Sequence, residues 1–263
     1  MERSLGGPAI VLALVLAEVA IGGVAVLWAV PLWGKVRVGF FKLTGAILTA
    51  IAILAALAAR SPLLDAPGAT GATRAAVWLL VAFAGATVGW QVTLWARAHA
   101  ATRLLAFASI PVGAAALVAI AFDPAAARAP ILAAYQLLAG AAFAGAATDG
   151  LLLGHWYLVD RRLSREPLAR MNIMFLAGAA VAGVAALLSQ GGGGQAQETL
   201  SPLLGAGALA AWLALGLVVL CATIGLFIRA LIRENSIQAA TGLFYLGVIM
   251  GLSAEFAAKV RFF

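Results

Sequence analysis

Four residues that could bind a proton or a polar ligand lie inside apolar runs of this chain. Glu18 is in the first run, Asp149 and His155 are in the segment TDGLLLGHWYLVDRR, and Glu255 is in the last run. A charged carboxylate at the centre of a bilayer costs about 2.5 to 3.5 kcal/mol on insertion scales, so such an acid must face protein or water, or carry a proton. We therefore identify Glu18 and Asp149 as candidate proton or ligand sites, expected near each other in the protein interior. A simple hydrogen bond to a neighbouring helix is the alternative for each.

His155 follows Asp149 by six residues, which places it about 120° around an α-helix from that acid. The two side chains therefore do not form an acid–imidazole pair along one helix face. An imidazole can exchange protons near neutral pH or donate a hydrogen bond to a quinone carbonyl. His155 also precedes Trp156 and Tyr157, and these residue types gather where helices meet lipid headgroups. A quinol or substrate contact and an ordinary interface residue both stay open for this histidine.

Glu255 precedes Lys259 by four residues, the favourable order for an ion pair on one helix face. The two residues lie near the end of the last apolar run, so we expect the pair close to the membrane interface. A structural pair and a functional role for Glu255 are equally compatible with this position. Lys42, near the start of the second apolar run, can reach the interface with its long side chain and is expected to be structural.

Other kinds of site find no support in the sequence. There is no phosphate-binding loop, no zinc-ligand spacing and no Ser/His/Asp arrangement. Cys221 is a lone cysteine in an apolar run, so we expect a buried packing residue and no thiolate metal site. His99 is expected outside its helix, just past Arg97, which argues against a haem held between it and His155. We expect no metal and no covalent cofactor, and a quinone is the cofactor that His155 could contact.

The composition indicates which elements must position these residues. The chain has 263 residues, of which 64% are hydrophobic and 10% charged, compared with about 25% charged in an average soluble domain. Apolar stretches long enough to cross a ~30 Å hydrocarbon core recur along the whole chain. This predicts an all-α polytopic membrane protein with about eight transmembrane helices, surrounded by the lipid bilayer. The expected helices cover residues 8–33, 37–59, 74–96, 103–122, 130–159, 171–189, 202–231 and 236–259.

A faint internal repeat suggests two four-helix halves, residues 1–128 and 129–263. FKLTGA in the second helix aligns with MFLAGA in the sixth at an offset of 133, and VWLL in the third aligns with AWLA in the seventh at 134. Such halves would be parallel repeats related by an axis along the membrane normal. At this offset Glu18 falls within two residues of the counterpart of Asp149. Chance agreement between alanine-rich helices is the alternative.

The basic residues predict the orientation in the membrane. Eleven bases lie in or beside the loops after helices one, three, five and seven, and six lie on the opposite side. Cytoplasmic loops collect Lys and Arg, so both termini are expected on the non-cytoplasmic side of the membrane. The membrane is expected to be the plasma membrane of a prokaryote. The bases are scattered over short loops and form no single patch, which argues against nucleic acid as a partner. The eleven are Lys35, Arg37, Lys42, Arg97, Arg103, Arg161, Arg162, Arg165, Arg170, Arg229 and Arg233.

Eight helices, two possible halves, deep acids and the closing SAEFAAKVRFF together resemble a known family. The chain is similar to the quinol-interacting membrane anchors of the polysulfide and DMSO reductase type, the NrfD-like subunits. The resemblance implies two four-helix bundles, a quinol pocket between helices and docking onto an iron–sulfur subunit. The last helix of that family often contains GE followed by an arginine; here AE at 254–255 is followed by Lys259 and Arg261. Only Glu255 carries over, as a neighbour of a quinol site.

Three functions follow from these observations. The first is a subunit of a redox or respiratory complex, not catalytic alone, that binds quinol near His155. It would dock other subunits through the arginine-rich loop 160–170 or through the loops on the opposite side. The second is a proton- or cation-coupled transporter or channel using Asp149 and Glu18, although Pro111 is the one broken-helix signal. The third is a membrane scaffold. A lipid-open apolar pocket near His155 would favour the first, and a polar cavity reaching Asp149 would favour the second.

Overall fold

The computed structural model describes residues 8–32, 36–64, 69–123, 129–160, 162–190 and 206–260. These residues form eight α-helices, and each contains a segment long and apolar enough to cross a membrane. No strand occurs in the described ranges, so the prediction of an all-α polytopic membrane protein is confirmed. The helices are α1 (Pro8–Leu27), α2 (Val38–Ala59), α3 (Gly71–Trp95), α4 (His99–Ala121), α5 (Pro130–Val159), α6 (Glu166–Gln190), α7 (Ala206–Arg233) and α8 (Ile237–Val260).

Several predicted helix ends were wrong, and local chemistry explains the clearest ones. α1 ends at Leu27 and is followed by a 3-10 turn at Val30–Leu32, because Pro31 has no amide hydrogen to continue the helix. α4 begins at His99 and not at residue 103, so His99 is helical and not in a loop. α4 starts this early because the turn between α3 and α4 is very short. α6 likewise begins earlier than expected, at Glu166.

The short turn between α3 and α4 has a close counterpart between α7 and α8. Arg97 and Asn235 have positive φ values of 59° and 62°, and they are the non-glycine residues with this conformation in the described part of the chain. In both turns an amide reaches back past the helix end: Ala98 N donates to Thr93 O at 2.9 Å, and Ser236 N donates to Leu231 O at 2.8 Å. Such bonds satisfy the free carbonyls at a helix C-terminus. The matching turns fit a division into two four-helix halves, which stays a prediction.

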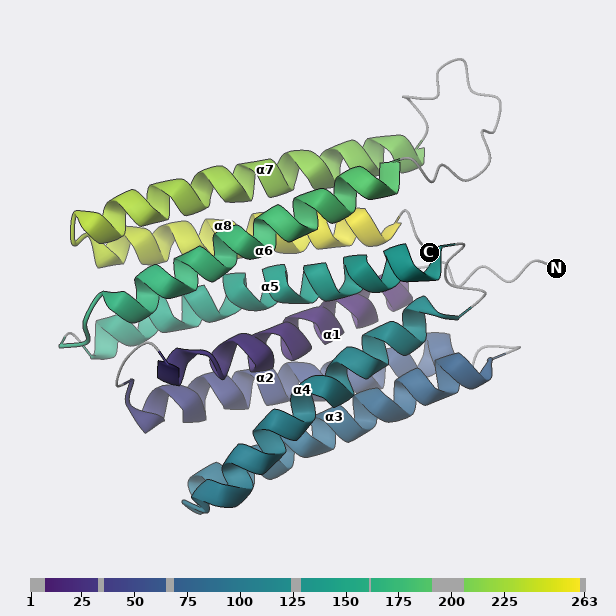
Figure 1. The fold of residues 1–263 in the computed structure, drawn as a ribbon, viewed down its shortest axis with the longest axis horizontal. Helices are drawn as coiled ribbons and strands as arrows, with labels where there is room; N and C mark the ends of the chain where they lie inside the picture. Colours follow the sequence, from purple (N-terminus) through teal and green to yellow (C-terminus); the bar gives the residue numbers. More distant parts are fainter. Residues whose placement is uncertain are drawn as a thin grey trace.

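The helices form two groups around a central pair (Figure 1). α1 and α5 lie in the middle, α2, α3 and α4 lie on one side, and α6, α7 and α8 lie on the other. α1 is buried along nearly its whole length, whereas the outer helices expose large apolar side chains to the surroundings. These exposed side chains are what a lipid bilayer requires of a protein surface. The structure is therefore that of an integral membrane protein in contact with lipid.

The central pair runs parallel and is in backbone contact. A Cβ atom on Gly22 of α1 would lie 1.7 Å from the carbonyl oxygen of Ala141, and one on Gly145 of α5 would lie 2.2 Å from the carbonyl carbon of Gly22. Any larger side chain at either glycine would separate the helices, as is common where membrane helices approach closely. This contact fixes the register between α1 and α5, and therefore the level at which each polar residue lies.

Candidate functional site

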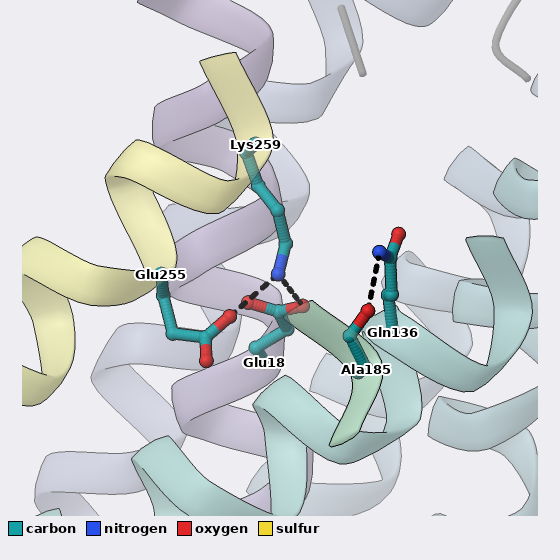
Figure 2. Close-up of polar contacts among 5 residues, drawn as sticks. All are labelled: Glu18, Gln136, Ala185, Glu255 and Lys259. Atoms are coloured by element: carbon teal, nitrogen blue, oxygen red, sulfur yellow. Dashed lines mark hydrogen bonds and ion pairs between the residues drawn. The ribbon is translucent and has the colours of Figure 1, made fainter. Parts of the chain in front are cut away.

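Three charged side chains from two helices meet in the interior and form what we call the glutamate–lysine cluster: Glu18, Glu255 and Lys259 (Figure 2). Lys259 Nζ lies 2.7 Å from Glu18 Oε1 and donates to Glu255 Oε2 at 2.6 Å. The exposed fractions are 0% for Glu18, 4% for Glu255 and 1% for Lys259. The cluster is thus an ion-pair network shielded by protein, and it joins α1 to α8.

The expected pair between Glu255 and Lys259 is present near the end of α8, where protein covers both side chains. The pair is buried because α1 and α5 cover this end of α8. Gly140 of α5 is packed directly against the acids: a Cβ atom there would lie 2.5 Å from Glu255 Oε2 and 2.7 Å from Glu18 Oε1. A glycine at this position is therefore needed for the cluster to assemble.

The cluster carries unequal numbers of positive and negative groups. If all three residues are ionised, two carboxylates face one ammonium, and the net charge is −1. Glu18 Oε2 has no hydrogen-bond partner among the described residues. An unbalanced charge in a low-dielectric interior is costly, so an added proton or monovalent cation would stabilise the arrangement. The chemistry available to this site is the gain and loss of one positive charge.

A cavity of about 30 Å³ adjoins the cluster and lies between α5, α6, α7 and α8. Its polar walls come from Gln136, Glu255 and Lys259, and alanines supply most of the rest. Gln136 Nε2 donates to Ala185 O at 3.2 Å, and its Oε1 atom is buried without a hydrogen-bond partner in the described ranges. We name this space the α5–α8 cavity. At ~10–15 Å³ for each water position, it has room for about two water molecules.

Asp149 is also fully buried, but it stands alone. Neither carboxylate oxygen has a hydrogen-bond partner in the part of the chain that the structure describes. The expectation that Asp149 lies near Glu18 was wrong. The glycine contact between α1 and α5 places Glu18 opposite Gly140, and Asp149 follows Gly140 by nine residues, about 13 Å along the helix at ~1.5 Å per residue. The two acids therefore occupy separate levels of the bundle.

His155 lies farther along α5, towards the opposite end of the bundle. Its Nδ1 atom is 3.0 Å from Leu151 O, and its Nε2 atom is hydrogen-bonded to the hydroxyl of Tyr245 on α8. The two rings meet edge to face with centroids 4.9 Å apart. Tyr245 is 47% exposed, so the pair lies at the outer surface of the helices. Nothing in the sequence identified Tyr245, because its pairing depends on how α5 and α8 are aligned.

The remaining candidate residues have mainly local contacts. Lys42 Nζ lies 4.0 Å from the ring centroid of Trp95, a cation–π contact near the membrane boundary. Cys221 is buried, and its Sγ atom is 3.7 Å from Gly247 O. His99 is exposed in the first turn of α4. Within the described ranges, no group of three or more His, Cys, Asp or Glu side chains is arranged to hold a metal ion.

The arginine-rich loop is only partly available for docking. Arg165 Nη1 donates to Arg233 O at 3.2 Å, and Arg170 forms an exposed ion pair with Glu166 at 2.5 Å. Both contacts lie within the protein itself. Lys35, Arg161 and Arg261, used above for orientation and for the family motif, lie outside the described residues.

In the comparisons with known proteins, no protein-family model and no curated protein sequence matches this chain. The resemblance to quinol-interacting membrane anchors therefore stays a prediction, as does the quinone.

Proposed function

We propose that this integral membrane protein is a proton-coupled carrier that binds and releases a proton at the glutamate–lysine cluster while a small solute or cation crosses the bilayer. The observation that supports this proposal is the buried cluster of two carboxylates and one ammonium beside a polar-walled cavity. Intramembrane ionisable residues are costly and are commonly kept for ion or proton pathways.

The cluster offers a direct way to couple a proton to helix packing. Glu18 belongs to α1, whereas Glu255 and Lys259 belong to α8, so the contact between Glu18 and Lys259 joins the central pair of helices to one of the outer groups. A proton on Glu18 would remove its attraction for the ammonium and weaken this contact. Loss of the proton would restore it. Lys259 lies against both Glu18 and Glu255, and both charged neighbours are on α8, so a movement of α8 would change the protonation of Glu18.

A second function, a quinol-binding subunit of a redox complex, is favoured by the pair of His155 and Tyr245. An imidazole held by a phenol at the outer surface of α5 and α8 could accept a proton from a quinol in the lipid. In this case the protein would not be catalytic alone and would require electron-carrying partner subunits. We rank this function second, because His155 does not line the α5–α8 cavity and the cavity walls include charged groups.

Infrared difference spectroscopy during a pH titration of the purified protein tests the carrier. A C=O stretching band of protonated carboxyl groups should change with pH and disappear in Glu18→Gln or Glu255→Gln. Glu166→Gln is the matched control, because Glu166 forms an exposed ion pair with Arg170 four residues later. If both cluster variants keep the full pH-dependent band of the wild type, the cluster does not exchange protons and the proposal fails.

Proton movement can be measured without knowing the transported solute. Proteoliposomes on a solid-supported membrane should give a transient current after a pH step, as protons enter the membrane field and reach the cluster. Glu18→Gln should lose this current, and Glu166→Gln should keep it. Native mass spectrometry distinguishes the redox subunit, since iron–sulfur partners or a retained quinone would favour that function over the carrier.

A further inference from the structure

The α5–α8 cavity lies close to one end of the bundle. Gln136 is the seventh residue of α5, and Lys259 is the last residue but one of α8. Ala211 is the sixth residue of α7, and Ala185 lies five residues before the end of α6. The cavity therefore lies in the half of the bundle where α5 and α7 begin, and these four lining residues are within about two helical turns of that end. Water at that end of the bundle is its nearest solvent.

The cavity walls are suited to hold water. Gln136 is 7% exposed and leaves Oε1 unpartnered, and Glu255 and Lys259 supply charged groups on the same cavity. Lys259 has three N–H groups and makes two close contacts with carboxylates, which leaves a donor for a further partner. A buried water needs two to four polar partners, and these three side chains provide them.

A group of phenylalanine rings lies deeper in the bundle than the cavity, farther from the end where α5 begins. Phe143 follows Gly140 by three residues on α5 and stacks on Phe175 of α6, with ring centroids 5.7 Å apart. Phe175 in turn contacts Phe244 of α8 at 5.9 Å. All three side chains are 0% exposed. A Cβ atom on Gly251 would lie 3.3 Å from Phe143 Cζ, so this part of the interior is tightly filled.

We propose that the α5–α8 cavity is a hydrated entry for protons, holding about two water molecules, and that Phe143, Phe175 and Phe244 close it towards the opposite side of the membrane. Protons then reach Glu255 and Lys259 from the end where α5 begins, and pass to Glu18 through the cluster. This inference rests on the proposed proton-coupled function and adds the route and the side of access.

Accessibility of an introduced cysteine to silver ions tests the route. The single native cysteine is removed as Cys221→Ala, and Ala214→Cys places a thiol on the cavity wall. Leu213→Cys, one residue away but 57% exposed on the outer surface, is the matched control. Silver(I) is a small ion that binds thiolates, and thiolates form only where water reaches. Protection from maleimide after denaturation, measured by mass spectrometry, reports silver binding.

The expected result is protection of Ala214→Cys and not of Leu213→Cys when silver is added on the side where α5 begins. Gly71→Cys, open at the start of α3, reports that side, and Glu234→Cys, exposed in the α7–α8 turn, reports the other. The inference would be overturned if silver protected neither Ala214→Cys nor Leu213→Cys while the reporter thiols on both sides bound silver. This result would show that the cavity is dry. Because silver binding does not require the cluster to titrate, this failure is distinct from loss of the infrared band.

Removing part of the phenylalanine seal tests the sidedness. In the Ala214→Cys background, Phe143→Ala should make the thiol accessible from both sides. Phe175→Leu is the milder variant and should increase access from the far side to a smaller extent. If thermal unfolding shows both variants folded and neither is labelled from the far side, these rings are not the seal.

Discussion

Glu18 and Asp149 are both fully buried acids beside the contact between α1 and α5, but their surroundings differ completely. Glu18 lies 2.7 Å from the ammonium of Lys259, with Glu255 on the same ammonium. Asp149 has no partner for either oxygen in the described residues. An isolated carboxylate in such a place is far more costly than a paired one, so we expect Asp149 to be the neutral acid. The comparison separates a charged level of the bundle from a neutral one.

Removing the ammonium group of Lys259 should reduce the stability of the protein more than any other change predicted below. Lys259→Met leaves two carboxylates side by side without their counterion, and loss of one partner of a buried ion pair costs about 3–5 kcal/mol. The free energy of unfolding in detergent should fall by an amount of this order. The measurement is unfolding by denaturant, followed by circular dichroism or tryptophan fluorescence.

The control for this variant is Arg170→Met, which breaks the exposed pair with Glu166. Exposed pairs contribute only about 0–1 kcal/mol, so this change should be small. The triple variant Glu18→Gln, Glu255→Gln and Lys259→Met should recover much of the stability, since no buried charge is left. Equal effects of Lys259→Met and Arg170→Met would mean that the cluster is not an ionic network.

A smaller loss of stability is expected for substitution of Gly140, whose backbone packs against the glutamate–lysine cluster. Gly140→Ala introduces a methyl group within 2.7 Å of carboxylate oxygens from both glutamates and must push them apart. Overpacking of this kind costs about 1–3 kcal/mol. Gly85→Ala on α3 is the control, because no atom lies within 4 Å of the added Cβ. There the better helix propensity of alanine should keep or raise stability by up to about 1 kcal/mol. A Gly140 variant as stable as the Gly85 variant would contradict the close packing.

Substitution of Asp149, the acid of the neutral level, should change the stability much less. Asp149→Asn exchanges a neutral carboxyl group for an amide of similar size, so the free energy of unfolding should change by about 1 kcal/mol or less. The infrared spectrum should lose a carboxyl C=O band that the wild type shows at every pH of the titration. This separates Asp149 from Glu18, whose band should vary with pH. A loss of stability as large as that of Lys259→Met would mean that Asp149 is ionised and paired.

Of the two ion pairs in the glutamate–lysine cluster, only one could be predicted from the sequence. Glu255 and Lys259 are four residues apart on one helix, so their pairing follows from helix geometry alone. The contact of Glu18 with Lys259 depends instead on the register of α1, α5 and α8. Gly22 and Gly145 set that register. Their spacing of four residues from Glu18 and Asp149 predicts close helix contacts, but the sequence does not show that these two glycines bring α1 and α5 together.

The number of helices could be predicted from the sequence more accurately than the positions of their ends. Apolar runs separated by charged, proline-rich or glycine-rich loops predict eight spans, because a bilayer imposes both length and hydrophobicity. Helix ends depend on turns of a few residues, such as the one in which Arg97 takes a positive φ and His99 starts α4. The pairing of His155 with Tyr245, separated by 90 residues, is likewise a consequence of packing.

A loss of stability of similar size to that of Asp149→Asn, and no effect on the proton current, is expected outside both levels, at the pair of His155 and Tyr245. Tyr245→Phe removes one hydrogen bond from a partly exposed histidine, which is worth about 0.5–1.5 kcal/mol. The pH-step current of the carrier should stay unchanged, because the cluster lies on a different part of α5. Ser253→Ala, on an exposed part of α8, is the control for stability. If Tyr245→Phe abolishes the current while Glu18→Gln leaves it intact, the proton site belongs to His155, and the charged level is structural.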